Sequence, residues 1–245
     1  MALNADKSDT IIIGTRQRSC SYSALTSVDV AGSTTPLADN VKILGVTLDK
    51  HLTFDDHVSA VCKLAYYHIT SGQCATFAED MAKSVTCALI GSRIDYANCA
   101  LYGMSSSNVA RLHHAQSAAA RLVILDSRQR STNSFGLEKQ LHWLPIESCI
   151  QFKIACITYK TVSAAQPAYL HSVLKQYALS RRLRSSDCSL LAVSRVCTFF
   201  GSRSFAVAAP TTWNSLRLHI RNSFSVFGFR SQLKTFLYKL AFDPL

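Results

Sequence analysis

Hydrophobic positions form short runs over the first fifty residues and then recur at helical spacing along most of the chain. Apolar and β-branched runs at Thr10–Gly14, Ser27–Val30 and Val41–Leu48 are separated by polar turns, which predicts three strands. From Phe54 onward, apolar residues recur at i, i+3, i+4 and i+7, which predicts helices. The pattern therefore indicates an α+β chain that is mainly helical, with a small β segment in its N-terminal part.

Polar residues mark where several of these helices begin. Thr53 with Asp56 and Thr76 with Glu79 have the spacing of capping boxes, in which a hydroxyl accepts from a free amide of the first helical turn. Ser105 has the same position before an apolar stripe that contains Gln116. Three further helices and one strand are predicted in the second half: helices at Ile146–Val162 after Pro145, from Pro210, and at Val226–Leu240 after Ser225, and a strand at Leu190–Val196.

The elements fall into three regions. Residues 1–52 form the β segment, whose three short strands need further covering structure to bury an apolar face. Residues 53–126 form a helical bundle, because short polar links favour antiparallel neighbours. Asp126–Ser134 is polar and lacks periodicity, so we expect a linker there and a second, mostly helical region over 127–245. Phe199, Phe200, Phe205 and Trp213 are expected to form a hydrophobic cluster in that region, and Trp143 is expected to anchor a core.

Charge separates the two halves of the chain. Residues 1–126 contain 10 Lys and Arg against 11 Asp and Glu, whereas residues 127–245 contain 16 against 4. Arginine predominates in the basic half, and its planar guanidinium group binds phosphate through two parallel hydrogen bonds. We therefore expect the basic half to contact the backbone of RNA or DNA without sequence preference.

Cysteine usage argues against a metal site or a disulfide framework. The nine cysteines include no C-x-x-C pair, and most lie on apolar helical faces, which is typical of free thiols in a reducing compartment. The sequence predicts no cofactor, no metal site and no small-molecule ligand. It shows neither a signal peptide nor an apolar run long enough for a membrane span. We expect an intracellular protein, cytoplasmic or nuclear or both, and the oligomeric state is not predicted.

Several motifs resemble the C-terminal part of reverse transcriptases from LINE-type (non-LTR, jockey-like) retrotransposons. They are LNADKSDTIIIGTRQ at Leu3–Gln17, ILGVTLD with LTFDDHVSAVC between Ile43 and Cys62, SRIDYANCALYG at Ser92–Gly103, LHWLPIESCIQFKI at Leu141–Ile154, and AVAAPTTWNSLRLHIR at Ala206–Arg221. They occur in the family's order and cover nearly the whole chain. The resemblance implies the end of a palm sheet, a thumb-like bundle and a basic C-terminal region.

The resemblance also implies where chemistry is absent. Phe54-Asp55-Asp56 looks like the metal-binding aromatic-x-Asp-Asp of a polymerase, but capping explains both acids, and in the family that motif precedes a segment like LNADKS. We therefore expect no enzyme activity from this chain alone, no catalytic residue, and catalytic carboxylates upstream of Met1. Leu44, Gly45 and Val46 match the family's primer grip, for which an ordinary core strand is the alternative.

The candidate nucleic-acid contacts are the basic side chains of the region from Lys175 to Lys239, where only Asp187 opposes them. A serine-rich segment, Leu179–Ser186, holds three arginines that are placed to bind successive phosphates. The full set is Arg181, Arg182, Arg184, Arg195, Arg203, Arg217, Arg221, Arg230 and Lys234. The alternatives are a captured helical protein–protein interaction module and a pseudogene product without selected function.

Overall fold

The computed structural model describes residues 8–22, 24–30, 32–70, 79–124, 134–177 and 189–243. Most of these residues are helical, and the strands form two small antiparallel ribbons, so the predicted mainly helical α+β class is confirmed. The elements are α1 (Arg16–Ser21), β1 (Ser27–Val30), β2 (Ser33–Pro36), β3 (Asn40–Ile43), β4 (Val46–Asp49), α2 (Asp55–Thr70), α3 (Glu79–Asp95), η2 (Asn98–Leu101), α4 (Ser106–Ile124), α5 (Ser134–Gln140), α6 (Ile146–Ala164), α7 (Ala168–Val173), α8 (Phe199–Ser202), α9 (Phe205–Ser215), α10 (Leu218–Arg221) and α11 (Val226–Phe242).

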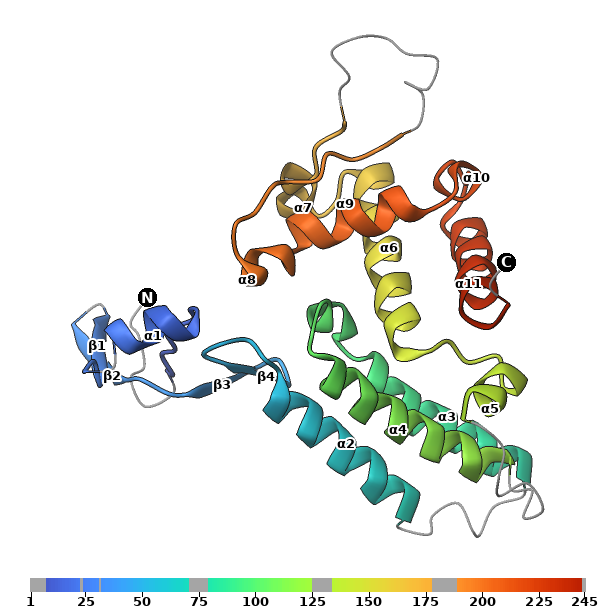
Figure 1. The fold of residues 1–245 in the computed structure, drawn as a ribbon, viewed down its shortest axis with the longest axis horizontal. Coiled ribbons are helices and arrows are strands. Elements are labelled where there is room, and N and C mark those ends of the chain that lie inside the picture. The colour runs from blue at the N-terminus through green and yellow to red at the C-terminus, as the bar shows by residue number, and fades with distance from the viewer. Residues whose placement is uncertain are drawn as a thin grey trace.

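Among the described residues the β segment contains two hairpins, β1–β2 and β3–β4, and β4 of the second hairpin packs against α2 (Figure 1). The predicted strand at Ser27–Val30 is confirmed as β1. The prediction of a single strand over Val41–Leu48 is wrong. Leu44 and Gly45 have φ of 47° and 83° and turn the chain, so β3 and β4 form a hairpin there. Thr10–Gly14 is also not a strand; only Thr10 forms a bridge, with Leu37.

Helices α2, α3 and α4 pack side by side as a bundle at the lower end of the molecule (Figure 1). The predicted cap of α4 is confirmed, because the Asn108 amide donates to Ser105 Oγ at 3.4 Å. Gly91 lies within α3 and does not end it. The predicted capping hydroxyl of Thr76 lies outside the described residues.

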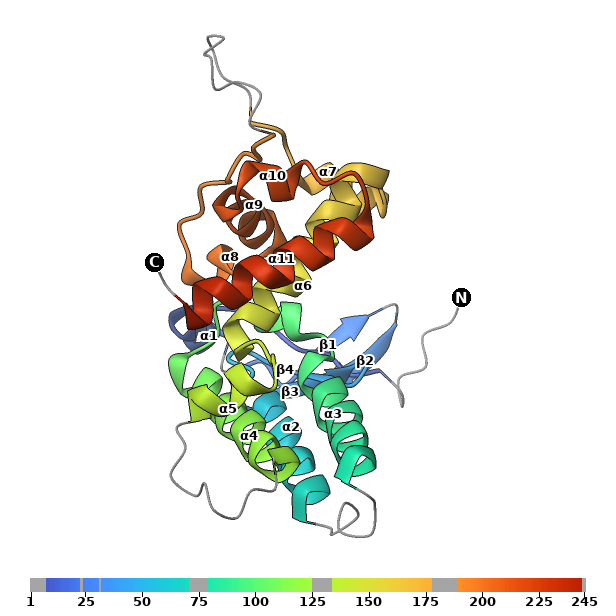
Figure 2. The same cartoon turned by 90° about the vertical axis from the view of Figure 1, so that its right-hand side faces the viewer.

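Helix α6 joins two hydrophobic cores. Its first half contributes Ile146, Ile150 and Ile154 to a core shared with α2, α3 and α4. Its second half contributes Tyr159 to a core shared with α9, α10 and α11, in which Trp213 is buried. Figure 2 shows α11 crossing over α6 above the bundle. The first core therefore includes residues on both sides of position 126, and the boundaries of the three regions stay predictions.

The C-terminal region departs from the sequence predictions at three places. Pro210 lies inside α9 and does not start a helix. Leu190–Val196 is not a continuous strand: within it, Leu191 forms an isolated antiparallel bridge with Gln176, and the Asn214 side chain bonds the amide and the carbonyl of Leu191 at 3.0 and 2.8 Å. The predicted aromatic cluster is wrong: Phe199 and Phe200 are exposed, Phe205 packs against the first core, and Trp213 lies in the second.

The last helix begins as the sequence predicts. The Gly228 amide donates to Ser225 Oγ at 3.0 Å, and α11 runs from Val226 to Phe242, two residues beyond the predicted end. Helix α6 likewise begins at Ile146 after Pro145. In the described segments, no helix combines the length and the apolar character that crossing a bilayer requires.

Candidate nucleic-acid interface

The two acids of Phe54-Asp55-Asp56 lie at the start of α2, and asparagine side chains from other parts of the chain donate hydrogen bonds to them. Asn108 donates to the Asp55 carboxylate and Asn40 to the Asp56 carboxylate, each at 2.7 Å. The Asp55 amide donates to Thr53 Oγ1 at 3.3 Å, so Thr53 accepts from an amide of the first helical turn as predicted, but from the residue two positions on and not from Asp56. Within the described residues, no three His, Cys, Asp or Glu side chains form a group that could hold a metal ion.

Asp49, at the end of β4, is a contributor to this helix start that the sequence analysis missed. Its carboxylate accepts from the amides of Thr53 and Phe54 at 2.9 and 2.8 Å. Although burial alone would raise the pKa of Asp49, these amide hydrogen bonds hold that pKa below its ordinary value. The carboxylate therefore remains charged and orders the loop before α2.

Leu44, Gly45 and Val46 do not form a continuous strand. Leu44 is 86% exposed at the hairpin turn, and its carbonyl accepts from the Tyr96 hydroxyl at 2.5 Å. Val46 begins β4 and packs against the first core. A primer-grip role for these three residues stays a prediction, now on a hairpin tip.

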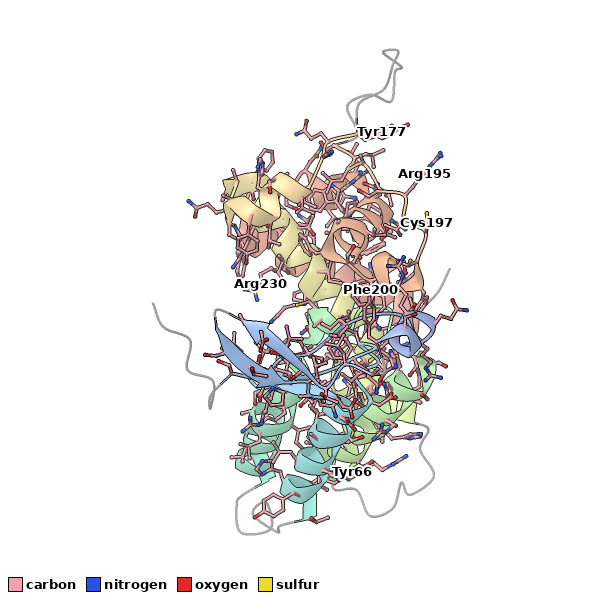
Figure 3. The ribbon with its side chains drawn as sticks, turned by 90° about the vertical axis from the view of Figure 1, so that its left-hand side faces the viewer. Tyr66, Tyr177, Arg195, Cys197, Phe200 and Arg230 are labelled. Carbon is pink, nitrogen blue, oxygen red and sulfur yellow. The ribbon has the colours of Figure 1, made fainter. Side chains whose placement is uncertain are left out.

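The structure does not gather all the candidate cations on one face. Arg181, Arg182 and Arg184 lie outside the described residues. Figure 3 shows Arg195 and Arg230 on opposite sides of the upper half of the molecule. Two further candidate arginines contact other parts of the chain. The Arg217 guanidinium lies over the Phe236 ring, 5.8 Å from its centre. Arg221 is half-buried and lines a cavity of about 470 Å³ beside Trp213.

The Arg203 side chain is partly buried and bonds backbone carbonyls, so its role is structural and it is not placed to bind phosphate. Its guanidinium group donates to the Leu52 carbonyl at 2.6 Å and to the Tyr102 carbonyl at 3.0 Å. The same group lies 5.3 Å from the centre of the Phe54 ring. Burial lowers the pKa of Arg203, with Asp49 opposing that effect. Arg203 thus ties α8 to the loop before α2, and we remove it from the set of candidate phosphate contacts.

Arg230 and Lys234 are the two candidates that the structure brings together. They are four residues apart on α11, so they lie on one face of that helix. Both line a cavity whose wall also contains Lys153 of α6. Sequence reasoning missed Lys153, because its partners are contributed by a helix about eighty residues later in the chain. Three cations from two packed helices therefore surround one opening.

The cavity lies between the bundle and the C-terminal helices and has a volume of about 430 Å³. This size is within the range of small-molecule pockets, roughly 300–1,000 Å³. Trp143 and Phe152 give the wall aromatic surface, while Asp95, Asn98 and Gln116 give it polar groups. Trp143 is half-buried against the first core, as the sequence predicts, and is also part of this wall.

Burial favours the neutral forms of three side chains in the wall, Asp95, Cys149 and Cys156. Burial raises the pKa of Asp95, and Lys153 opposes that effect. Burial, with Asp95 and Glu138 nearby, raises the pKa of Cys149 to about 12, and burial also raises the pKa of Cys156. The thiols are therefore poor nucleophiles, and the positive charge of the three cations dominates the opening.

Comparisons of this chain with protein-family models, curated proteins and solved structures found no match. Arguments about function therefore rest on the sequence motifs and on the geometry described above.

Proposed function

We propose that this chain is the C-terminal part of a LINE-type reverse transcriptase and that it binds the backbone of RNA or DNA. In this proposal Lys153, Arg230 and Lys234 bind successive phosphates where α6 and α11 meet. The family resemblance implies that a thumb and a basic tail hold nucleic acid by its backbone. The proposal assigns no polymerase activity to this chain, because asparagine side chains engage both Asp55 and Asp56.

The convergence of the three cations is the observation that carries the proposal. Of the charged side chains in the cavity wall, only Asp95 is acidic, and burial raises its pKa. Three cations that line one cavity with a single acid favour a polyanion, since its binding releases condensed counterions. Aromatic side chains beside the cations add surface on which an unpaired base can stack.

Fluorescence anisotropy with a labelled single-stranded RNA tests the proposal. A triple variant, Lys153→Gln, Arg230→Gln and Lys234→Gln, should weaken binding at least tenfold, since each phosphate that is no longer bound costs about 0.5 kcal/mol. The matched control replaces three exposed cations that do not line the cavity, as Arg18→Gln, Lys42→Gln and Lys63→Gln. Equal weakening in the two triple variants would leave the α6–α11 site without support.

A second candidate, the captured protein-interaction module, has one observation in its favour. Phe224 and Phe227, around the start of α11, are almost entirely exposed, and neighbouring exposed phenylalanines are typical of protein contacts. Such a contact would persist as salt rises, whereas phosphate binding would weaken. Replacing both with serine should leave RNA affinity unchanged if the nucleic-acid proposal holds.

A further inference from the structure

Two residues of the cavity wall, Asn98 and Gln116, each have a buried acceptor oxygen without a hydrogen-bond partner among the described residues. Asn98 is 3% exposed and Gln116 is 7% exposed. Their amide nitrogens are anchored, since Asn98 Nδ2 donates to Asp95 Oδ1 at 3.3 Å and Gln116 Nε2 donates to the Leu144 carbonyl at 2.9 Å. Asn98 Oδ1 and Gln116 Oε1 have no partner among the described residues. The anchored nitrogens fix the amide orientation, so both free groups are acceptors.

Unpaired buried acceptors are unfavourable, and a ligand that donates N–H groups to them gains the bonds that the folded chain leaves unmade. Both residues line the cavity that also holds Trp143 and Phe152. The wall therefore combines residues that have unpaired acceptors with aromatic side chains. A flat, weakly polar ring that carries N–H donors fits this combination.

The cations are the third feature of the cavity wall, beside the unpaired acceptors and the aromatic side chains. Lys153, Arg230 and Lys234 line the same cavity, and their charge suits a phosphate attached to the ring. From these three features we propose that the cavity binds one unpaired nucleobase that bears an exocyclic amino group, with its phosphate at the three cations. Adenine, cytosine and guanine bear such a group, and uracil does not. The inference rests on the proposed function, because the same cations hold the backbone in both.

Cytosine and uracil provide a matched pair of probes. They have the same size and differ at position 4, an amino donor in cytosine and a carbonyl acceptor in uracil, and at N3, an acceptor in cytosine and an N–H donor in uracil. We would compare a strand of about twelve uridines with the same strand carrying one central cytidine, by anisotropy at one salt concentration. Charge and length are equal, so a difference in affinity reports the base alone. The cytidine strand should bind about tenfold more tightly, because the cytosine amino group offers two N–H donors to the two acceptors, whereas uracil offers one, at N3.

Variants that remove the acceptor oxygens test whether the preference for cytidine comes from this cavity. Gln116→Met and Asn98→Leu remove the acceptor oxygens, so each should reduce the preference for cytidine to about twofold or less while affinity for the uridine strand stays the same. The triple cation variant should weaken both strands equally and keep their ratio. These opposite effects separate base recognition from backbone binding.

Gly91 offers a test that does not disturb the buried amides. It lines the cavity on α3, and a Cβ added there meets no atom within 4 Å. Gly91→Phe should fill the cavity and abolish the preference for cytidine, whereas Gly91→Ala should keep the preference and serves as the control. Circular dichroism of both variants verifies that the helical fold is retained.

The outcomes distinguish the inference from the function on which it rests. Salt-sensitive binding of both strands with equal affinity overturns the base pocket and leaves backbone binding intact. Absence of binding to either strand at low salt overturns both. A preference for CMP over UMP as free nucleotides supports a pocket for the mononucleotide, and a preference only within strands supports a base held as part of a polymer.

Discussion

Glu138 of α5 provides a sharp test of the helical core, because its carboxyl group is fully buried and titrates near neutral pH. Its Oε1 accepts from Ser117 Oγ at 3.3 Å and lies 3.4 Å from His113 Nδ1, while Oε2 has no partner among the described residues. Burial raises the pKa of Glu138 from 4.5 to about 7, with the Ser117 bond opposing. Burial and the neighbouring His114 lower the pKa of His113, so the histidine is mostly neutral at pH 7.

The sign of the effect follows from this raised pKa. The folded chain holds the Glu138 proton more tightly than the unfolded chain, so folding is most favoured below about pH 4.5 and loses stability as pH rises toward 7. A pKa difference between 4.5 and about 7 corresponds to about 3 kcal/mol. Glu138→Gln resembles the neutral acid in shape and does not titrate. The variant should therefore exceed the unfolding free energy of the wild type by less than about 1 kcal/mol near pH 5 and by about 3 kcal/mol near pH 8.

Urea unfolding followed by circular dichroism, at intervals between about pH 5 and pH 8, measures this difference. Glu147→Gln on the exposed start of α6 is the control, because it removes one negative charge without a buried carboxyl. A difference between wild type and Glu138→Gln that stays constant over this range would refute the reasoning.

Three further predictions follow from named contacts. Arg203→Met should lower the free energy of unfolding by about 2–4 kcal/mol in urea denaturation, since two charged hydrogen bonds to carbonyls are removed, and should leave RNA affinity unchanged. Asp49→Ala should cost about 1–2 kcal/mol at pH 7 through the missing amide bonds, and this cost should shrink as the pH falls below the ordinary carboxyl value of 3.8 toward the lowered pKa of Asp49. Peptide mapping after iodoacetamide treatment should show exposed Cys197 alkylated before Cys149, whose pKa of about 12 leaves about a thousandfold less thiolate than the ordinary value of 9.0.

Local signals allowed much of the fold to be predicted from the sequence. The caps at Ser105 and Ser225 and the proline before α6 identified helix starts, because a cap bonds to amides within the next few residues. The apolar run around Leu44 was misread as one strand, since only the backbone turn at Leu44 and Gly45 reveals the hairpin. The contribution of Asp49 was missed because it bonds to amides four and five residues later, beyond the capping pattern.

The candidate site could be predicted only in part, because it depends on packing between distant segments. Arg230 and Lys234 were recognised from their place in a basic region, but Lys153 joins them only through the packing of α6 against α11. Gln116 was assigned to an apolar stripe of its helix. Periodicity predicted its burial, but not its bond to the Leu144 carbonyl or its position in the cavity wall.

The salt dependence of RNA binding tests the central claim most directly. The logarithm of the affinity for a single strand falls with the logarithm of salt concentration, with a slope of about 0.7 for each phosphate neutralised. If Lys153, Arg230 and Lys234 each bind a phosphate, the triple variant should reduce that slope by about 2, and the variant of Arg18, Lys42 and Lys63 should not change it. Identical slopes for the wild type and both triple variants, or no RNA binding at low salt, would contradict the account.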